Sequence, residues 1–240
     1  MGFVLAYFYP FIKGYHCDIL SSRGKLLARE RGDKLPLGIQ QQIEQGIIIL
    51  KQGGLVAFPT DTVYGLGACA TIPQAVERLY QVKERPRNIA LPLLLAHPSQ
   101  IAEVAEPVPE IAWHLIENFM PGALTLVLYK SSSVPDIITA GGETIAVRIP
   151  DHPVPVALAQ GVGAPIIGTS ANLSGKPSSV TADEVYSQLG DRIDLIIDGK
   201  CPGGRESTIV DVTGETPVIL REGAISREEL KKVCGSVLFK

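Results

Sequence analysis

The residues Gly168-Thr-Ser-Ala-Asn-Leu-Ser-Gly-Lys-Pro-Ser178 directly follow a short apolar run, Ala164-Pro-Ile-Ile167. The apolar run is typical of a buried strand, and the residues after it carry small hydroxyl and amide side chains. Open α/β sheets bind ligands at the carboxyl ends of their strands, where such side chains offer hydrogen bonds with little bulk. Taken alone, the stretch is equally well explained as a polar turn. Three further segments of similar design favour a ligand site.

The first of these segments is Gly53-Gly-Leu-Val-Ala-Phe-Pro-Thr-Asp-Thr-Val-Tyr-Gly-Leu-Gly67. Its residues 55–58 predict a strand that ends at a proline, with Thr60-Asp-Thr62 at the tip. We expect Gly65 and Gly67 to let the backbone approach a ligand or adopt a positive φ angle. The segment therefore predicts a second group of hydroxyls at a strand end.

The other two segments supply cations. Lys83-Glu-Arg-Pro86 ends a helical pattern, and because the proline stops the helix we expect Lys83 and Arg85 to face solvent or ligand, not the core. Thr144-Ile-Ala-Val-Arg148 predicts a strand. Alternation along a strand places Thr144 and Arg148 on one face, so both could reach one ligand.

Composition indicates one globular domain. The chain has 240 residues, of which 45% are hydrophobic and 20% charged. This length and composition are typical of a folded enzyme domain, and no apolar run approaches the roughly 18 residues that span a membrane. The four cysteines are scattered and no two histidines have metal-ligand spacing, so neither a disulfide framework nor a zinc site is predicted. Reduced thiols predict a cytoplasmic protein.

Residues 1–35 differ from the rest. They carry six Lys/Arg against three Asp/Glu, a net charge of +3, whereas the whole chain has −3. They show no clear period, no cationic leader region and no Ala-x-Ala cleavage site, so a secretory signal is not predicted. We expect a poorly ordered extension or a start codon assigned too early, with a divergent organelle-targeting peptide as the less favoured alternative. Residues 36–240 are expected to form the catalytic domain.

Helical and strand patterns alternate from Pro36 onward. Capping boxes are predicted where Thr71, Thr181 and Ser226 precede helices. Helices are expected near residues 39–47, 75–82, 111–119, 154–160 and 181–189 and from 226, and strands at 55–58, 91–96, 124–129, 145–149, 165–168, 195–197, 208–212 and 218–220. The pattern predicts an α/β fold: a single-domain, twisted, mixed β-sheet with helices on its faces.

Six motifs occur in one order: Pro59-Thr-Asp-Thr-Val-Tyr-Gly65, Lys83-x-Arg85-Pro86, Pro121-Gly-Ala-Leu-Thr125, Ala146-Val-Arg148, Ser170-Ala-Asn172 and Ser207-Thr-Ile-Val-Asp211. With them the chain resembles the YrdC-like family over roughly residues 38–226. The Lys-x-Arg and Ser-x-Asn motifs are that family's signature. The likeness is greatest to its short-form threonylcarbamoyl-adenylate synthases, which lack the additional C-terminal domain of the long form.

The resemblance implies an enzyme, a nucleotidyltransferase that joins L-threonine, bicarbonate and ATP into threonylcarbamoyl-adenylate and releases pyrophosphate. This product serves the threonylcarbamoyladenosine modification of tRNA. The expected partners are the three substrates, Mg²⁺ accompanying ATP, and a downstream tRNA threonylcarbamoyl transferase complex. A weak direct contact with tRNA is possible in this interpretation, and no membrane partner is expected.

The resemblance also implies roles for individual residues. Threonine would be held by Thr62, Arg148 and Ser207. Lys83 and Arg85 would be the catalytic residues, because they neutralise the triphosphate. The other contacts to ATP are expected from Thr144, Ser170, Asn172, Ser178 and Arg221. No Gly-x-x-x-x-Gly-Lys-Ser/Thr P-loop occurs, so these cations and hydroxyls must hold the phosphates, and no protein metal ligand is expected.

Three other functions remain open. A nucleic-acid-binding module is disfavoured by the net negative charge. The carbamoyl-adenylate step of hydrogenase maturation would bring an acylphosphatase domain and Cys-x-x-Cys motifs. A side branch of the family without assigned activity is disfavoured because both signature motifs are present. Gly203-Gly-Arg205 could bind phosphate, but such a loop is more often a turn.

Overall fold

The computed structural model describes residues 38–240, so the predictions made for residues 1–35 lie outside it. Its helices are α1 (Ile39–Lys51), α2 (Pro73–Val82), α3 (Ile101–Val104), α4 (Glu110–Phe119), α5 (Asp136–Thr139), α6 (Pro153–Val162), α7 (Ala182–Leu189) and α8 (Arg227–Cys234), with short 3₁₀ turns at Pro98–Gln100 and Gly190–Arg192. None of the helices in this part of the chain is long and apolar enough to cross a membrane.

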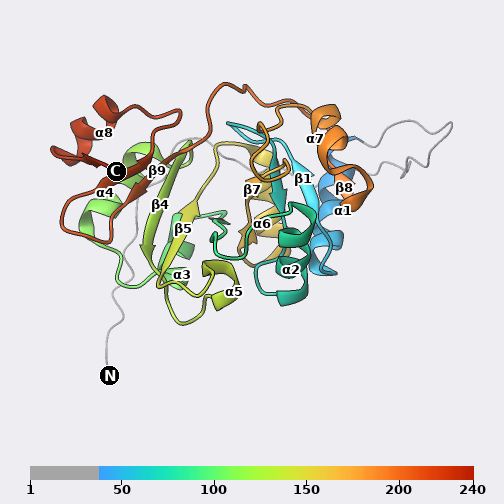
Figure 1. Ribbon diagram of the computed structural model, residues 1–240, viewed down its shortest axis with the longest axis horizontal. Coiled ribbons are helices and arrows are strands. Elements are labelled where there is room, and N and C mark those ends of the chain that lie inside the picture. Colours follow the sequence, from blue (N-terminus) through green and yellow to red (C-terminus); the bar gives the residue numbers. More distant parts are fainter. Residues whose placement is uncertain (1–37) are drawn as a thin grey trace. The chain divides into compact units, whose positions relative to one another are not determined.

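The strands are β1 (Val56–Phe58), β2 (Gly65–Gly67), β3 (Leu93–Leu94), β4 (Leu124–Tyr129), β5 (Thr144–Arg148), β6 (Ile166–Ile167), β7 (Thr169–Ser170), β8 (Leu195–Ile196), β9 (Thr208–Asp211), β10 (Val218–Arg221) and β11 (Leu238–Phe239). They form a seven-stranded sheet in the order β11-β10-β9-β4-β5-β3-β6 and a four-stranded sheet in the order β7-β2-β1-β8 (Figure 1). Both sheets are mixed: β4 pairs with β5 antiparallel and with β9 parallel, and β1 pairs with β2 antiparallel and with β8 parallel.

One short segment passes through both sheets. β6 pairs with β3 in the larger sheet, and β7 pairs with β2 in the smaller one. Gly168 lies between them, and a Cβ there would stand 2.1 Å from Leu94 Cγ, so only glycine fits at this crossing. The predicted mixed α/β class is confirmed, and the expected single sheet is divided into two that meet at this glycine.

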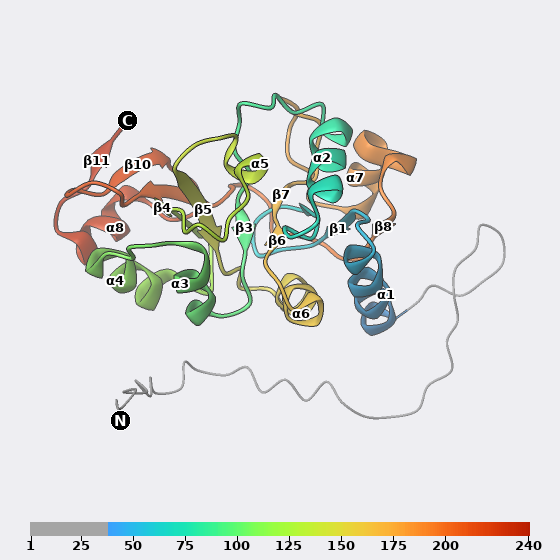
Figure 2. The ribbon, with the colours of Figure 1, turned by 90° about the horizontal axis from the view of Figure 1, so that it is seen from below.

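The central strands are buried on both faces. In and next to β1, Leu55 and Ala57 pack into the larger hydrophobic cluster, while Val56 and Phe58 pack into a second cluster with α1 and α6. Alternate side chains of a strand point to opposite faces, which explains why this strand is a continuous apolar run. Figure 2 shows α1, α3, α4 and α6 along one side of the strands and α2 and α5 along the other.

Most predicted elements are confirmed, including the strand at 124–129 and the capping box of α8 at Ser226. At α7 the predicted N-cap bond from Glu184 N to Thr181 is present, but the box is not closed, because the Glu184 carboxylate accepts from Val180 N instead. The cap predicted at Thr71 is wrong, because α2 begins at Pro73 with Ile72 as its N-cap. The short elements β2 and α5 were not predicted. Three residues of strand or four of helix are too few to show a period.

The positive φ angle expected as one alternative for Gly65 and Gly67 is also wrong. Neither has a positive φ angle. Instead, a Cβ on Gly65 or Gly67 would lie 2.6 Å or 2.7 Å from the ring of Phe58. Both glycines are required because this buried ring lies over β2.

Candidate active site

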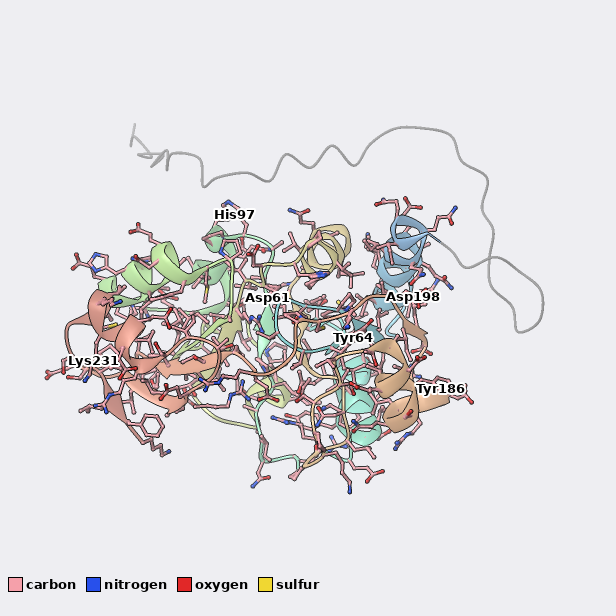
Figure 3. All side chains as sticks on the ribbon, turned by 90° about the horizontal axis from the view of Figure 1, so that it is seen from above. Asp61, Tyr64, His97, Tyr186, Asp198 and Lys231 are labelled. Carbon is pink, nitrogen blue, oxygen red and sulfur yellow. The ribbon has the colours of Figure 1, made fainter. Side chains whose placement is uncertain are left out.

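The predicted site residues come from both sheets and from the loops between them. Figure 3 shows Asp61 near the middle of the described residues, between the strands of the seven-stranded sheet and the region of Tyr64. The loop 59–64 joins β1 to β2, and it is fixed by backbone bonds from Tyr64 N to Ser179 O (2.8 Å) and from Ala171 N to Tyr64 O (2.8 Å). These bonds hold the end of this loop beside the 168–178 stretch.

Arg148 lies at the end of β5, and its side chain is only 9% exposed. Its Nη1 donates to Thr62 Oγ1 (3.0 Å), its Nε to Gly122 O (2.9 Å), and its Nη2 to Asp61 Oδ1 (2.6 Å). Thr62 is itself buried, and it is oriented by Thr60 (Oγ1 to Oγ1, 3.1 Å). The structure thus brings together two of the residues predicted to hold threonine.

Ser207 and Arg221 form a second group beside the first. Arg221, at the end of β10, donates from Nη2 to Ser207 O (2.9 Å) and to Ser207 Oγ (3.2 Å). Ser207 Oγ also lies 2.8 Å from Thr125 Oγ1. Burial is the main cause of the lowered pKa of Arg148, and repulsion by Arg221 adds to it while Asp61 opposes it. The two guanidinium groups are therefore close enough to repel each other.

Glu206 connects this group to the 168–178 stretch. Its Oε1 accepts from Ser178 Oγ (2.5 Å), and its Oε2 forms an ion pair with Arg221. Two residues predicted to bind ATP therefore contact one carboxylate. An anionic ligand at this position would compete with Glu206 for the same donors.

Lys83 is placed differently from the prediction. It follows the last residue of α2, but it is 1% exposed, so the expectation of a solvent-facing side chain is wrong. Its Nζ donates to Ser170 O and to Asn172 O (2.6 Å). Burial, with repulsion from Arg85, lowers the pKa of Lys83 to about 7, although Glu206 opposes the shift. Both signature motifs therefore meet at this ammonium group.

Arg85 and Thr144 have no described contact with the other predicted residues. Arg85 is half-buried and donates from Nε to Ile89 O (3.2 Å) and from Nη2 to Ala90 O (2.8 Å). It acts on Lys83 through its charge. Thr144 is half-buried at the start of β5, on the strand face that also carries Arg148, opposite to the face of the core residues Ile145 and Val147.

Asn172 has one hydrogen-bond acceptor that is not satisfied within residues 38–240. Its Nδ2 donates to Leu173 O (2.9 Å) and Lys176 O (2.6 Å), which fixes the amide orientation. Its Oδ1 is buried and has no hydrogen-bond partner among the described residues. A buried acceptor without a donor is rare in folded proteins. A ligand that donates a hydrogen bond would satisfy it.

Two acidic residues in the site were not predicted. Asp61 and Glu206 each contact a predicted arginine. The signal was present, because Asp61 lies inside the quoted Thr60-Asp-Thr62 tip and Glu206 directly precedes Ser207. Cations and hydroxyls are the groups that match an anionic ligand, and carboxylates do not, so a pattern chosen for an anion passes over both residues.

The site holds no cluster typical of a protein-bound metal. In residues 38–240, no three His, Cys, Asp or Glu side chains gather in a group that could hold an ion. The loop at Gly203-Gly-Arg205 bends at Gly204, with φ angles of 73° and 93° at its two glycines, and Gly203 N donates to Thr62 O (3.2 Å).

Comparisons with known proteins identify the family of this chain. The Sua5/YciO/YrdC family, described as "Telomere recombination", matches residues 48–223. The chain belongs to this family. It is 44% identical over 198 residues to the threonylcarbamoyl-AMP synthase of Bacillus subtilis, covering 82% of this chain and 57% of that protein.

Solved structures of the family have the same fold. Pyrococcus abyssi Sua5 complexed with L-threonine matches with a TM-score of 0.81 and 43% identity, over 82% of this chain and 58% of that one. Escherichia coli YciO matches with a TM-score of 0.73 and 30% identity, over 79% of this chain and 93% of that one. The chain thus spans less than two thirds of the B. subtilis and P. abyssi proteins.

Proposed function

We propose that this protein is an enzyme that synthesises L-threonylcarbamoyl-adenylate from L-threonine, bicarbonate and ATP with release of pyrophosphate, for the modification of tRNA. The relatives named threonylcarbamoyl-AMP synthase and the threonine complex of P. abyssi Sua5 support it. The observation that carries it is one continuous set of contacts, in which Glu206 joins Ser178 to Arg221 and Arg221 bonds to Ser207.

The reaction has two steps that balance without a redox partner. The threonine amine loses a proton and joins the carbon of bicarbonate with loss of water, which gives a carbamate. A carbamate oxygen then attacks the α-phosphorus of ATP, and the bond to the β-phosphate oxygen breaks with departure of pyrophosphate. The attacking group is already an anion, so positioning and charge neutralisation provide most of the catalysis.

The role of each site residue in the proposed reaction follows from its charge and its hydrogen-bonding groups. Arg148 presents a planar fork to the threonine carboxylate, and Thr62 and Ser207 hold its polar groups. Lys83 and Arg85 neutralise the triphosphate. Their positive charges form strong charge-assisted bonds to an anion in a partly dehydrated pocket. Ser170, Asn172, Ser178, Thr144 and Arg221 complete the nucleotide contacts. For ATP to bind, Arg221 and Ser178 must exchange Glu206 for phosphate oxygens.

We classify the enzyme as a nucleotidyltransferase. The magnesium ion is the one that ATP carries on its phosphate oxygens. The adenylate passes to a separate tRNA threonylcarbamoyl transferase complex, and tRNA itself is not needed for turnover. A cytoplasmic location stays a prediction.

Pyrophosphate release tests the proposal directly. The complete reaction contains MgATP, bicarbonate and L-threonine, and each is omitted in turn, as is the divalent ion. We expect release only in the complete mixture, with no change when tRNA is added. When site residues are changed in this assay, Arg192→Lys serves as the matched control, because Arg192 pairs with Glu84 and is 43% exposed. Release that persists without threonine, or that requires tRNA, would overturn the proposal.

A further inference from the structure

The pair of Asp61 and Arg148 is a buried ion pair within the site. Asp61 Oδ1 accepts from Arg148 Nη2 at 2.6 Å, and the side chains are 15% and 9% exposed. Removing two charges from water is costly, and their mutual attraction only partly offsets that cost. A pair in such a position therefore calls for an explanation beyond fold stability.

Both members of the pair retain hydrogen-bonding capacity. An arginine has five N–H donors, and the described bonds of Arg148 to Gly122, Thr62 and Asp61 use one from each nitrogen. One N–H on each terminal nitrogen therefore remains for a ligand. The described hydrogen bond of Asp61 uses Oδ1. Within residues 38–240, no hydrogen bond is described for its Oδ2.

A guanidinium beside a carboxylate is complementary to a zwitterion. An α-amino acid carries its carboxylate and its ammonium on the same carbon, so its two charges need opposite partners a few ångströms apart. Arg148 and Asp61 provide that spacing at the end of β5 and the tip of the β1–β2 loop. Thr62, which directly follows Asp61, also accepts a hydrogen bond from Arg148 (3.0 Å).

We propose that Asp61 binds the α-ammonium group of the amino acid substrate, while Arg148 binds its α-carboxylate. The inference rests on the proposed function and assigns a binding residue that the sequence did not reveal. It makes the site selective for zwitterionic amino acids over hydroxy acids. A hydroxyl cannot satisfy the carboxylate charge, whereas an ammonium forms a charge-assisted bond.

A simpler role for Asp61 would be to neutralise Arg148 alone. Arg148 already has two neutral acceptors, Gly122 O and Thr62 Oγ1, which orient its guanidinium without Asp61. The neutralising role predicts that both ligands bind Asp61→Asn at least as tightly as the wild type, because their carboxylates no longer share Arg148 with a charged Asp61. Only ammonium binding predicts that the preference for an ammonium over a hydroxyl disappears.

The test measures two ligands on two proteins by calorimetry. The ligands are L-threonine and the hydroxy acid of the same skeleton, in which a hydroxyl replaces the ammonium. The proteins are the wild type and Asp61→Asn, which keeps an oxygen for Arg148 but loses the charge. We expect the wild type to favour threonine by about 10- to 100-fold. In Asp61→Asn the preference should fall to about threefold or less, with MgATP affinity unchanged.

Asp136→Asn is the matched control. Asp136 also pairs with a cation, Lys130, but its side chain is 81% exposed, so the variant should keep the wild-type preference. The inference would be overturned if Asp61→Asn kept the preference for threonine, or if it lost affinity for both ligands equally. Either result would leave the proposed function standing. If Asp61→Asn does not fold, the wild type decides: equal affinity for both ligands overturns the inference. A wild type that binds no threonine overturns both proposals.

Discussion

Affinity for ATP should depend on the protonation of Lys83. This ammonium is 1% exposed and contacts two backbone carbonyls, and its pKa is lowered to about 7. A lysine with a depressed pKa holds its charge only below that value, and the charge is lost as the pH rises through it. Bound phosphate favours the charged form, so ATP binding should take up a proton above pH 7.

The magnitude follows from the fraction of charged lysine. With a pKa of about 7, roughly a quarter of Lys83 is charged at pH 7.5 and about 3% at pH 8.5. If ATP binds the charged form, its affinity should fall about eightfold over that unit of pH. ATP changes little in ionisation over the same range, so the dependence reports on the protein.

Calorimetry in buffers of different ionisation enthalpy measures both the affinity and the proton uptake. Lys83→Met should bind ATP weakly with little pH dependence. Because Lys83 is buried, this variant also leaves two carbonyls unpaired and should melt at a lower temperature. Arg85→Gln is a sharper control: it removes a neighbouring positive charge, so the pKa of Lys83 should rise and the transition should move to higher pH. ATP affinity in the wild type that is equal at pH 7.5 and 8.5, without proton uptake, would refute this reasoning.

Three further predictions concern binding and stability. Arg148→Lys keeps the charge but loses the planar fork, so the KM for threonine should rise about 10- to 100-fold with near-normal ATP affinity; a change within about twofold would mean that Arg148 only pairs with Asp61. Gly168→Ala should lower the free energy of unfolding by about 1–3 kcal/mol, because its Cβ would meet Leu94, whereas Gly214→Ala has open space and should unfold like the wild type. Ser226→Ala removes the N-cap bond to Glu229 N and should cost about 1 kcal/mol in chemical denaturation; an unchanged midpoint would show that α8 does not need this cap.

Local sequence predicted most elements and missed those without a local signal. The strand at 124–129 and the caps at Thr181 and Ser226 depend on neighbouring residues, so their patterns are visible in the chain. β2 has three residues, two of them glycine, and it forms because β1 and β7 pair with it. The role of its glycines depends on the ring of Phe58, which a one-dimensional pattern does not place.

The candidate site follows the same division. Thr62, Lys83, Arg148, Ser170 and Asn172 could be chosen from their motifs, and the structure places them in direct contacts. Thr144 and Arg85 have no such contacts, and their roles stay predictions. Asp61 and Glu206 became visible only as partners of Arg148 and Arg221.

The sequence by itself determined the alternation of strands and helices, the family, and the residue types of the proposed site. The tertiary structure alone decided where the charges lie. Lys83 is buried because residues 87 and 89 positions away supply its carbonyl partners, and Arg148 meets Asp61 across 87 positions. Desolvation and ion pairing depend on distance in space, and the distance along the chain does not reveal them.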